Sequence, residues 1–196
     1  MTITLRPGRD GDAPTITELQ AVTARVAYAH IFPPAAPFPL DETRRRWETF
    51  RGQLVVAEAG PRAIGFAAFE GQELHALYVL PEYWGTGVGE RLLHAAGGTL
   101  SPVERAERAP GNGVHPGELR TLWVLRENRR ARRFYEKHGW VADGTARLAY
   151  GVVELRYRRL PRSRSESRLP AVGVPSRPAA GSVLTGRACA RNRCDR

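Results

Sequence analysis

Residues 77–93, LYVLPEYWGTGVGERLL, constrain the fold more than any other stretch of this sequence. An apolar run reaches Val79, Pro81 follows, three glycines alternate with other residues over positions 85–89, and an amphipathic helix begins near Val88. This order predicts a strand, a turn poor in side chains, and a helix. Such a turn directs unpaired backbone N–H groups and the positive helix end toward one point. It therefore predicts a site for an anion, a pyrophosphate above all.

The spacing of these glycines excludes two common nucleotide-binding motifs. A dinucleotide fingerprint requires G-x-G-x-x-G and a P-loop requires a Gly-Lys-Ser/Thr ending, whereas residues 84–89 read WGTGVG. The alternative interpretation is a strand-to-helix turn in which the glycines only supply positive φ angles. The turn by itself leaves both interpretations open.

Hydrophobic periodicity along the chain predicts a mixed α/β fold. Helices are expected at about 13–29 with Asp12 as N-cap, at 40–50, from 88 to about 98, and from Asn128 to His138. Strands are expected at 2–7, 53–58, 63–70, 73–80, 118–125, 140–144 and 152–160. The second, third and fourth strands follow one another closely, which favours an antiparallel meander. A Gly/Pro-rich stretch at 101–117 is predicted to be a long loop.

The chain divides into a predicted folded domain at 1–160 and a basic tail at 161–196. The tail is rich in Pro, Ser and Arg and has no period, so we expect it to be disordered. Eight arginines against Glu166 and Asp195 give it +6 of the total charge of +10. Most of the basic excess therefore lies outside the expected domain, and a nucleic-acid-binding role is the less favoured interpretation.

Several classes of protein are disfavoured by composition. No apolar run approaches the roughly 20 residues of a membrane span, and the N-terminus lacks the apolar core of a signal peptide. Cys189 and Cys194 both lie in the tail, so the domain has no disulfide, Cys-rich metal site or Cys nucleophile. We expect a cytoplasmic protein without membrane contact or a metal.

Residues 122–140, LWVLRENRRARRFYEKHGW, form a second strand-to-helix unit, with Asn128 at the helix start and Tyr135 seven residues later. Together with the glycine turn, this unit resembles the GNAT superfamily of acyl-CoA-dependent N-acyltransferases over residues 2–160. The resemblance implies an α/β (α+β) fold with a mixed, mostly antiparallel sheet of about seven strands, flanked by about four helices. It also implies that strands four and five splay apart, and that acetyl-CoA is the co-substrate.

The resemblance implies a set of coenzyme-binding residues. Pantetheine would pair with the open edge of the strand that ends at Val79, the glycine turn would bind the pyrophosphate, and Asn128 would hydrogen-bond the coenzyme. The residues implied are Leu77, Tyr78, Val79, Gly85, Thr86, Gly87, Val88, Gly89, Glu90, Asn128 and Tyr135. The family usually has Gln or Arg before the first glycine, where this chain has Trp84. Backbone donors would then carry most of the anion recognition, with Arg91 as support.

Acetyl transfer to a primary amine sets three chemical tasks. An amine with a pKa of about 10 must lose a proton, at about 4 kcal/mol near neutral pH. The oxyanion needs fixed donors, and the departing thiolate needs a proton. By resemblance the N–H of Val79 polarises the thioester carbonyl and Tyr135 is the acid. For the base, Glu73, His75 and ordered water remain open. Without a cysteine in the domain, we expect direct transfer in a ternary complex.

The acceptor and the wider function stay open at this level. We expect a small-molecule or peptide amine, bound by the first helices, their Pro-rich connection and the loop between the last strands, with Glu42, Glu48 and Glu154 as candidates to attract it. The alternatives are an acyl-CoA sensor without turnover and, less favoured, an Arg-rich nucleic-acid binder. Dimers are common in the family, so a homodimer is compatible with the sequence.

Overall fold

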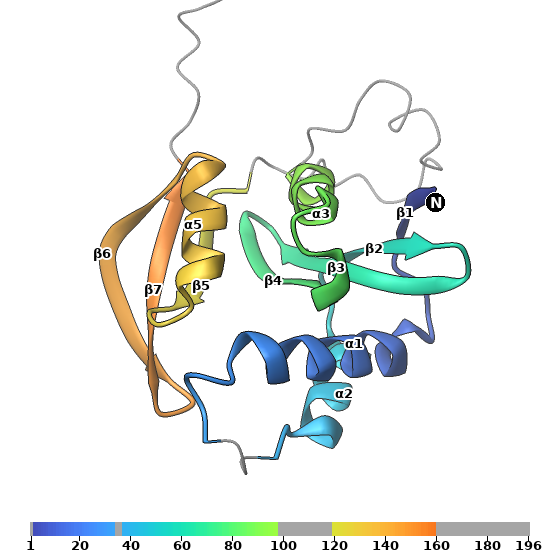
Figure 1. The fold of residues 1–196 in the computed structure, drawn as a ribbon, viewed down its shortest axis with the longest axis horizontal. Helices are drawn as coiled ribbons and strands as arrows, with labels where there is room; N and C mark the ends of the chain where they lie inside the picture. The colour runs from blue at the N-terminus through green and yellow to red at the C-terminus, as the bar shows by residue number, and fades with distance from the viewer. Residues whose placement is uncertain (1, 34–36, 98–118, 160–196) are drawn as a thin grey trace, which may run out of the picture. The chain divides into compact units, whose positions relative to one another are not determined.

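The computed structural model describes residues 2–33, 37–97 and 119–159. Along these ranges the elements are β1 (Ile3–Pro7), α1 (Asp12–Ala27), α2 (Leu40–Thr49), β2 (Gln53–Ala59), β3 (Arg62–Glu70), β4 (Glu73–Val79), the short 3-10 helix η1 (Pro81–Tyr83), α3 (Val88–Ala96), β5 (Thr121–Leu125), α5 (Arg129–Lys137), β6 (Trp140–Ala149) and β7 (Val152–Arg159) (Figure 1). The predicted loop at 101–117 and the predicted tail lie outside the described residues.

The strands form one seven-stranded sheet in the order β1-β2-β3-β4-β5-β7-β6. Every neighbouring pair is antiparallel except β4 and β5, which are parallel. The predicted α/β class, the meander β2-β3-β4 and the mostly antiparallel sheet are therefore confirmed. The last hairpin is longer than predicted, because β6 continues to Ala149.

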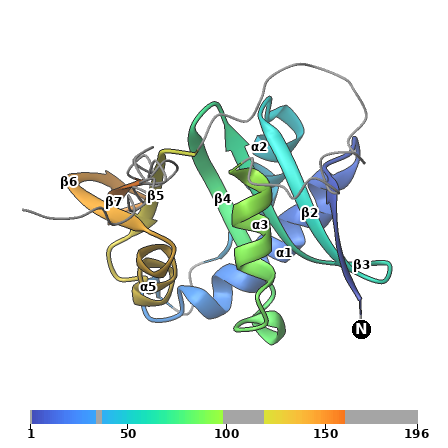
Figure 2. The ribbon, with the colours of Figure 1, turned by 90° about the horizontal axis from the view of Figure 1, so that it is seen from above.

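Strands β4 and β5 pair only at their beginnings. The register joins Glu73 to Thr121 and Leu74 to Leu122, and no later residue of β4 pairs with β5. Figure 2 shows the two groups of strands diverging from this point, with α5 beside β5 and α3 beside β4. The splayed strands that the family resemblance implied are present, and the rest of β4 presents an open edge.

The helices cover both faces of the β2–β4 part of the sheet. Helix α3 packs on one face against β2, β3 and β4, while α1 packs on the opposite face against β3 and β4, with α2 beside α1 (Figure 1). The largest side chains with less than 2% exposure are Trp140, Tyr157, Phe66, Phe69, Ile16, Ile64, Leu92, Leu93, Leu119 and Leu122. Burial of this apolar set is the main stabilising contribution and holds β4 rigidly in place.

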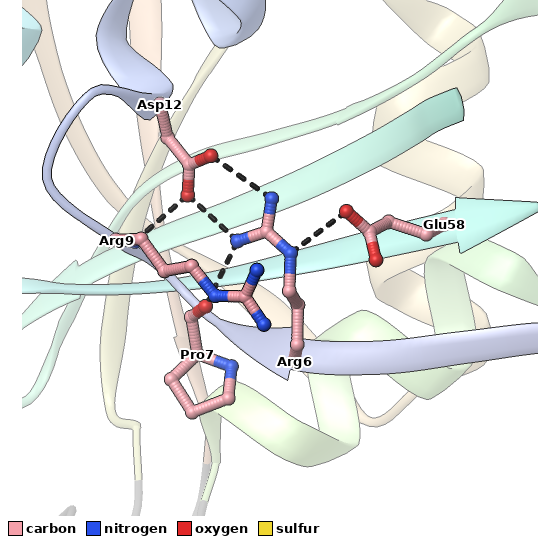
Figure 3. Close-up of polar contacts among 5 residues, drawn as sticks. All are labelled: Arg6, Pro7, Arg9, Asp12 and Glu58. Atoms are coloured by element: carbon pink, nitrogen blue, oxygen red, sulfur yellow. Dashed lines mark hydrogen bonds and ion pairs between the residues drawn. The ribbon is translucent and has the colours of Figure 1, made fainter. Parts of the chain in front are cut away.

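The start of α1 differs from the prediction that Asp12 is its N-cap. Gly11, with φ +92°, occupies the N-cap position, and Asp12 is the first helical residue. The reason is a stronger partner: Arg6 Nη1 and Nη2 donate to the Asp12 carboxylate at 2.7 and 2.9 Å, and Arg9 N donates at 2.8 Å (Figure 3). Arg6 Nε also donates to Glu58 at 2.7 Å, so one guanidinium ties β1 to α1 and β2.

Candidate active site

The glycine turn joins β4 to α3 through η1. Gly85 and Gly87 have φ angles of +80° and +87°, and no atom lies within 4 Å of where a Cβ would stand at either residue. The first intrahelical hydrogen bond of α3 runs from Arg91 N to Gly87 O at 3.0 Å. The N–H groups of the first residues, Val88, Gly89 and Glu90, therefore have no partner within the helix. Positive φ angles and an open anion cradle both occur here, so the two interpretations of the glycines are compatible.

Two side chains of the turn are engaged locally. Thr86 Oγ1 donates to Tyr83 O at 2.7 Å and closes the turn. Glu90 Oε2 lies 3.7 Å from His138 Nε2, which links the start of α3 to the end of α5. Both contacts hold the turn in shape.

The open edge of β4 presents alternate backbone groups toward β5. Leu80 N donates to Ile64 O at 2.9 Å, so the N–H and C=O of Val79 point to the opposite edge. By the same alternation Leu77 faces that edge, while Tyr78 faces β3. The predicted pairing surface for pantetheine therefore lies on Leu77 and Val79, and Tyr78 contributes its side chain rather than its backbone.

Trp84 occupies the position where the family pattern has Gln or Arg, and its indole makes two contacts of its own. Its Nε1 donates to Val79 O at 2.7 Å, which fixes the indole against the open edge. The Arg130 guanidinium of α5 stacks on the Trp84 ring, with Cζ 4.1 Å from the ring centroid. A cation from a different helix thus lies next to the glycine turn.

Arg91 does not serve as the expected support for the anion. Its Nη1 donates to Ile3 O at 2.9 Å, which directs the side chain to β1. The cause is its place on α3, where the helix passes the end of the N-terminal strand. Arg130 has no hydrogen bond or ion pair within the described part of the chain, so it is the better candidate for that role.

Helix α5 brings Asn128 and Tyr135 to the divergence of the strands. Asn128 is the N-cap, and its side chain accepts from Ala131 N at 3.1 Å, as the sequence predicted. Tyr135 is 8% exposed and packs against Phe134 and Trp140, with ring centroids at 5.3 and 6.2 Å. Burial raises the pKa of Tyr135, and nearby Tyr78 adds to the rise, so the phenol stays protonated at neutral pH.

A cavity of about 710 Å³ lies where β4 and β5 separate. It is bounded by α1, α2, residues 32–33 and 37–39 between them, β4, β5, the first turns of α5, and the β6–β7 hairpin. Tyr135, Asn128, Glu73 and His75 all line it. The sequence-predicted residues of the reaction are therefore brought together, and β4 leads from this cavity into the glycine turn.

The two candidate bases have different surroundings. Glu73 is half-buried at the start of β4 and forms no ion pair with any described residue. His75 Nε2 lies 4.0 Å from Glu70 Oε2, its ring packs edge-on against Phe50 at 5.6 Å, and its side chain is 27% exposed. Glu73 is thus the carboxylate with free lone pairs toward the cavity, whereas His75 already has neighbours on two sides.

Only two of the three acidic candidates for attracting an amine reach the cavity. Glu42 and Glu154 line it, and Glu48 is absent from its lining. Glu154 Oε2 accepts from Arg147 Nε at 2.7 Å, so this charge is neutralised by its neighbour. Arg147 also lies over the ring of Trp123, with Cζ 4.0 Å from the centroid, which makes Trp123 part of the cavity wall and not a proton acceptor.

The split sheet, the glycine turn after β4 and the buried tyrosine on the next helix define an acyltransferase type of fold. Solved structures with this fold include the PaiA N-acetyltransferase from Thermoplasma acidophilum in complex with coenzyme A. It is 21% identical in sequence, the match covers 80% of this chain and 98% of that chain, and the TM-score is 0.54. The ribosomal-protein-S18-alanine N-acetyltransferase from Escherichia coli is 18% identical over 81% of this chain and 93% of its own, with a TM-score of 0.54. At such identities the likeness establishes the fold alone.

Sequence comparison finds a domain family and curated proteins that this chain resembles. The acetyltransferase (GNAT) domain family matches residues 50–142. An uncharacterized N-acetyltransferase of Archaeoglobus fulgidus is 37% identical over 42% of this chain and 55% of that protein. One from Mycobacterium bovis is 32% identical over 52% of this chain and 61% of that protein. The family match covers slightly less than half of the chain, and the chain spans 55–61% of the length of these curated relatives.

Two features of this region could not be predicted from the sequence. Arg130 was one of several helix arginines without a distinguishing mark, and only the stack on Trp84 separates it from the others. Tyr28 and Tyr78 meet across the cavity, with their hydroxyl oxygens 3.3 Å apart, although 50 residues separate them in the chain. Trp84 carried the one usable signal, because it departs from the family pattern.

Proposed function

We propose that this protein is an N-acetyltransferase that transfers the acetyl group of acetyl-CoA to a primary amine by direct attack in a ternary complex. One observation carries this proposal: the open edge of β4 runs from a cavity lined by the protonated phenol of Tyr135 to a glycine turn, and the helix after that turn begins with N–H groups that have no partner within the helix. Such an arrangement suits a ligand with an acyl thioester at one end and a diphosphate at the other. The family and the fold support the same activity.

The coenzyme site fits the residues present. Positive φ angles at Gly85 and Gly87, without Cβ atoms, let phosphate oxygens approach the N–H groups of Val88, Gly89 and Glu90. The backbone of Leu77 would pair with a pantetheine amide, while the N–H of Val79 would remain for the thioester carbonyl, since Trp84 Nε1 already donates to Val79 O. In place of the family's polar residue at position 84, Arg130 would supply the positive charge. Stacking uses only the face of its guanidinium, so the in-plane N–H groups stay available for phosphate oxygens.

The chemical step assigns one task to each group. Glu73, directly or through water, accepts a proton from the ammonium form of the acceptor, and the free amine attacks the thioester carbon. The N–H of Val79 stabilises the oxyanion that forms. When the carbon–sulfur bond breaks, the Tyr135 hydroxyl donates its proton to the leaving sulfur, and the new amide nitrogen releases its extra proton to solvent. Solvent reprotonates the phenolate, and Glu73 returns its proton to solvent. The products are the N-acetylated amine and the free thiol of coenzyme A.

Burial of Tyr135 has a defined consequence for this role. Because burial raises its pKa, the phenol is protonated throughout the neutral range and is poised as an acid rather than as a base. A base is therefore needed elsewhere, which is consistent with the unpaired carboxylate of Glu73.

Release of free thiol from acetyl-CoA in the presence of a panel of amines tests the proposal, with the acetylated product identified by mass spectrometry. Tyr135→Phe should lower kcat about 100-fold and leave the KM for acetyl-CoA within about threefold, because it removes a proton donor and keeps the ring. Tyr83→Phe is the control, since this ring lies outside the cavity lining. Equal kcat values for wild type and Tyr135→Phe would remove Tyr135 from the mechanism.

A second experiment examines the order of events. Incubation with acetyl-CoA alone should give no acetylated protein by intact-mass measurement, because direct transfer needs no enzyme-bound acetyl group. An acetyl-enzyme that forms and then decays on addition of an amine would contradict direct transfer. A cytoplasmic location and a homodimer are further expectations of this proposal, the second testable by light scattering.

A further inference from the structure

The cavity has a helix side and a sheet side, and they carry different charges. On the helix side Arg25 and Arg46 line the cavity from α1 and α2, together with Glu42. Within the described ranges neither arginine has a carboxylate partner. On the sheet side the charge is the unpaired Glu73, since Arg147 and Glu154 neutralise one another. The helix side is therefore net positive and the sheet side net negative.

A fixed hydrogen-bond chain stands on the helix side. Trp47 Nε1 donates to Gln20 Oε1 at 2.8 Å, and Gln20 Nε2 donates to the Tyr78 hydroxyl oxygen at 3.3 Å. An indole N–H can only donate, so the Gln20 amide must present its oxygen to Trp47 and its nitrogen to Tyr78. The Tyr78 oxygen in turn lies 3.3 Å from that of Tyr28. The Tyr78 oxygen thus already accepts one hydrogen bond.

Only one of the two hydroxyl protons of Tyr28 and Tyr78 can be used in the hydrogen bond between them. A single hydroxyl proton can lie between the oxygens of Tyr28 and Tyr78. If Tyr78 supplies it, the proton of Tyr28 has no acceptor among the described residues, and if Tyr28 supplies it, the proton of Tyr78 has none. Burial raises the pKa of both phenols, so both are protonated at neutral pH. The pair therefore offers one O–H donor to whatever occupies the cavity.

Arg46 lies near this free donor. It extends from α2 over the Trp47 ring, with Cζ 5.3 Å from the centroid, and lines the same cavity as Tyr78. Its positive charge opposes the rise that burial causes in the pKa of Tyr78. A cation beside an unused O–H donor is a combination that recognises a carboxylate, because charge-assisted hydrogen bonds are the stronger ones.

We infer that the acceptor is an amine that also carries a carboxylate, with the carboxylate held on the helix side by Arg46 and the free hydroxyl of the Tyr28–Tyr78 pair. The amine then faces Glu73 on the sheet side, where the acetyl group arrives. This inference rests on the proposed acetyl transfer and adds the class of the acceptor. Phe32, Phe38 and Trp123 supply apolar wall for the remainder of the molecule.

Matched pairs of acceptors test this inference directly. Thiol release is measured with α-amino acids and linear ω-amino acids, each beside its own carboxamide, at saturating acetyl-CoA. Values of kcat/KM are normalised to the fraction of free base, because the amine of a carboxamide is the less basic one. At least one acid should exceed its carboxamide by about tenfold or more, the usual discrimination of a charged hydrogen bond.

Variants then locate the recognition. Arg46→Gln should lower the acid-to-carboxamide ratio about tenfold, and Arg46→Lys should restore part of it. Arg44→Gln, on the same helix but outside the cavity lining, is the matched control and should leave the ratio unchanged. Tyr28→Phe and Tyr78→Phe alone each leave one free O–H, so each should lower the ratio less than the double variant does.

The outcomes separate the two levels of the proposal. Acetylation of amines and carboxamides at rates equal to those of the acids would overturn the carboxylate site and leave acetyl transfer intact. An unchanged ratio in Arg46→Gln would also overturn it. Absence of thiol release with every amine, in a protein that binds coenzyme A by calorimetry, would overturn the proposed function and this inference together.

Discussion

The ion cluster around Arg6 makes the stability of the domain sensitive to one carboxylate. Asp12→Ala removes two hydrogen bonds from Arg6 and one from Arg9 N. The side chains of Arg6 and Asp12 are only 15% and 14% exposed, so solvent screens their attraction weakly. Breaking a buried pair costs about 3–5 kcal/mol and an exposed pair about 0–1 kcal/mol. Because Arg6 keeps Glu58, we expect about 2–3 kcal/mol.

This loss should be visible in urea and thermal unfolding. For a chain of this size it corresponds to a fall in Tm of about 5–10 °C. Glu82→Ala is the matched control: Glu82 accepts from Arg62 at 2.9 Å, but the side chains of Arg62 and Glu82 are 60% and 49% exposed. It should cost less than about 1 kcal/mol. Equal losses in the two variants would refute the argument that burial determines the strength of the Arg6 pair.

The pH dependence gives an independent check on the same pair. The hydrogen bond from Arg6 holds the pKa of Asp12 below the usual 3.8. A lowered pKa stabilises the fold above the unfolded value, and this contribution is lost as the pH falls through the folded pKa. The difference in free energy of unfolding between wild type and Asp12→Ala should therefore be constant near neutrality and shrink below about pH 4. A difference that grows in acid would contradict the assignment.

Further predictions concern the coenzyme and the base. Gly87→Ala should raise the Kd for coenzyme A about tenfold in calorimetry, because its Cβ enters the anion cradle at positive φ, whereas Gly60→Ala, also at positive φ, should leave the Kd unchanged. Arg130→Gln should raise the same Kd about tenfold and flatten its salt dependence, with no change for pantetheine, which lacks the diphosphate. Glu73→Gln should lower kcat about 100-fold if this carboxylate is the base, and His75→Gln less than about threefold.

Much of the fold follows from local patterns that tertiary contacts do not override. Short apolar runs mark β2 to β4, and the glycines at 85–89 mark the start of α3, because both signals arise from neighbouring residues. The N-cap of α1 was missed for the opposite reason. Asp12 has the side chain of an N-cap, but its carboxylate instead accepts hydrogen bonds from the Arg6 guanidinium. Arg6 is held in place by a further bond to Glu58, which lies on a different strand. Sequence patterns do not reveal such a long-range ion pair.

In the candidate site, too, the residues defined by local motifs were predictable and those defined by long-range contacts were not. Tyr135, Asn128 and the glycine turn were found because each sits at a fixed spacing within one strand-to-helix unit. The Tyr28–Tyr78 pair depends on the fold bringing α1 onto β4, and its free proton depends further on the Gln20–Trp47 contact that fixes the amide. If the proposals hold, recognition of an acceptor depends on contacts between elements, whereas most residues proposed to bind the coenzyme belong to local strand-to-helix motifs.

Under the proposed function, Arg130 would compensate from a different helix for the departure from the family pattern at Trp84. A Gln or Arg at position 84 would place its polar group on the turn itself, whereas the indole binds Val79 O and its face holds Arg130, which comes from α5. The positive charge proposed to bind the diphosphate would then come from the β5 side of the split between β4 and β5. Binding of the diphosphate would connect the two parts of the sheet through Arg130, so the Arg130→Gln variant should lose this connection as well as affinity. Hydrogen exchange in α5 reports it directly: coenzyme A should slow exchange there in the wild type more than in Arg130→Gln, and equal protection would show that the stack on Trp84 has no part in binding.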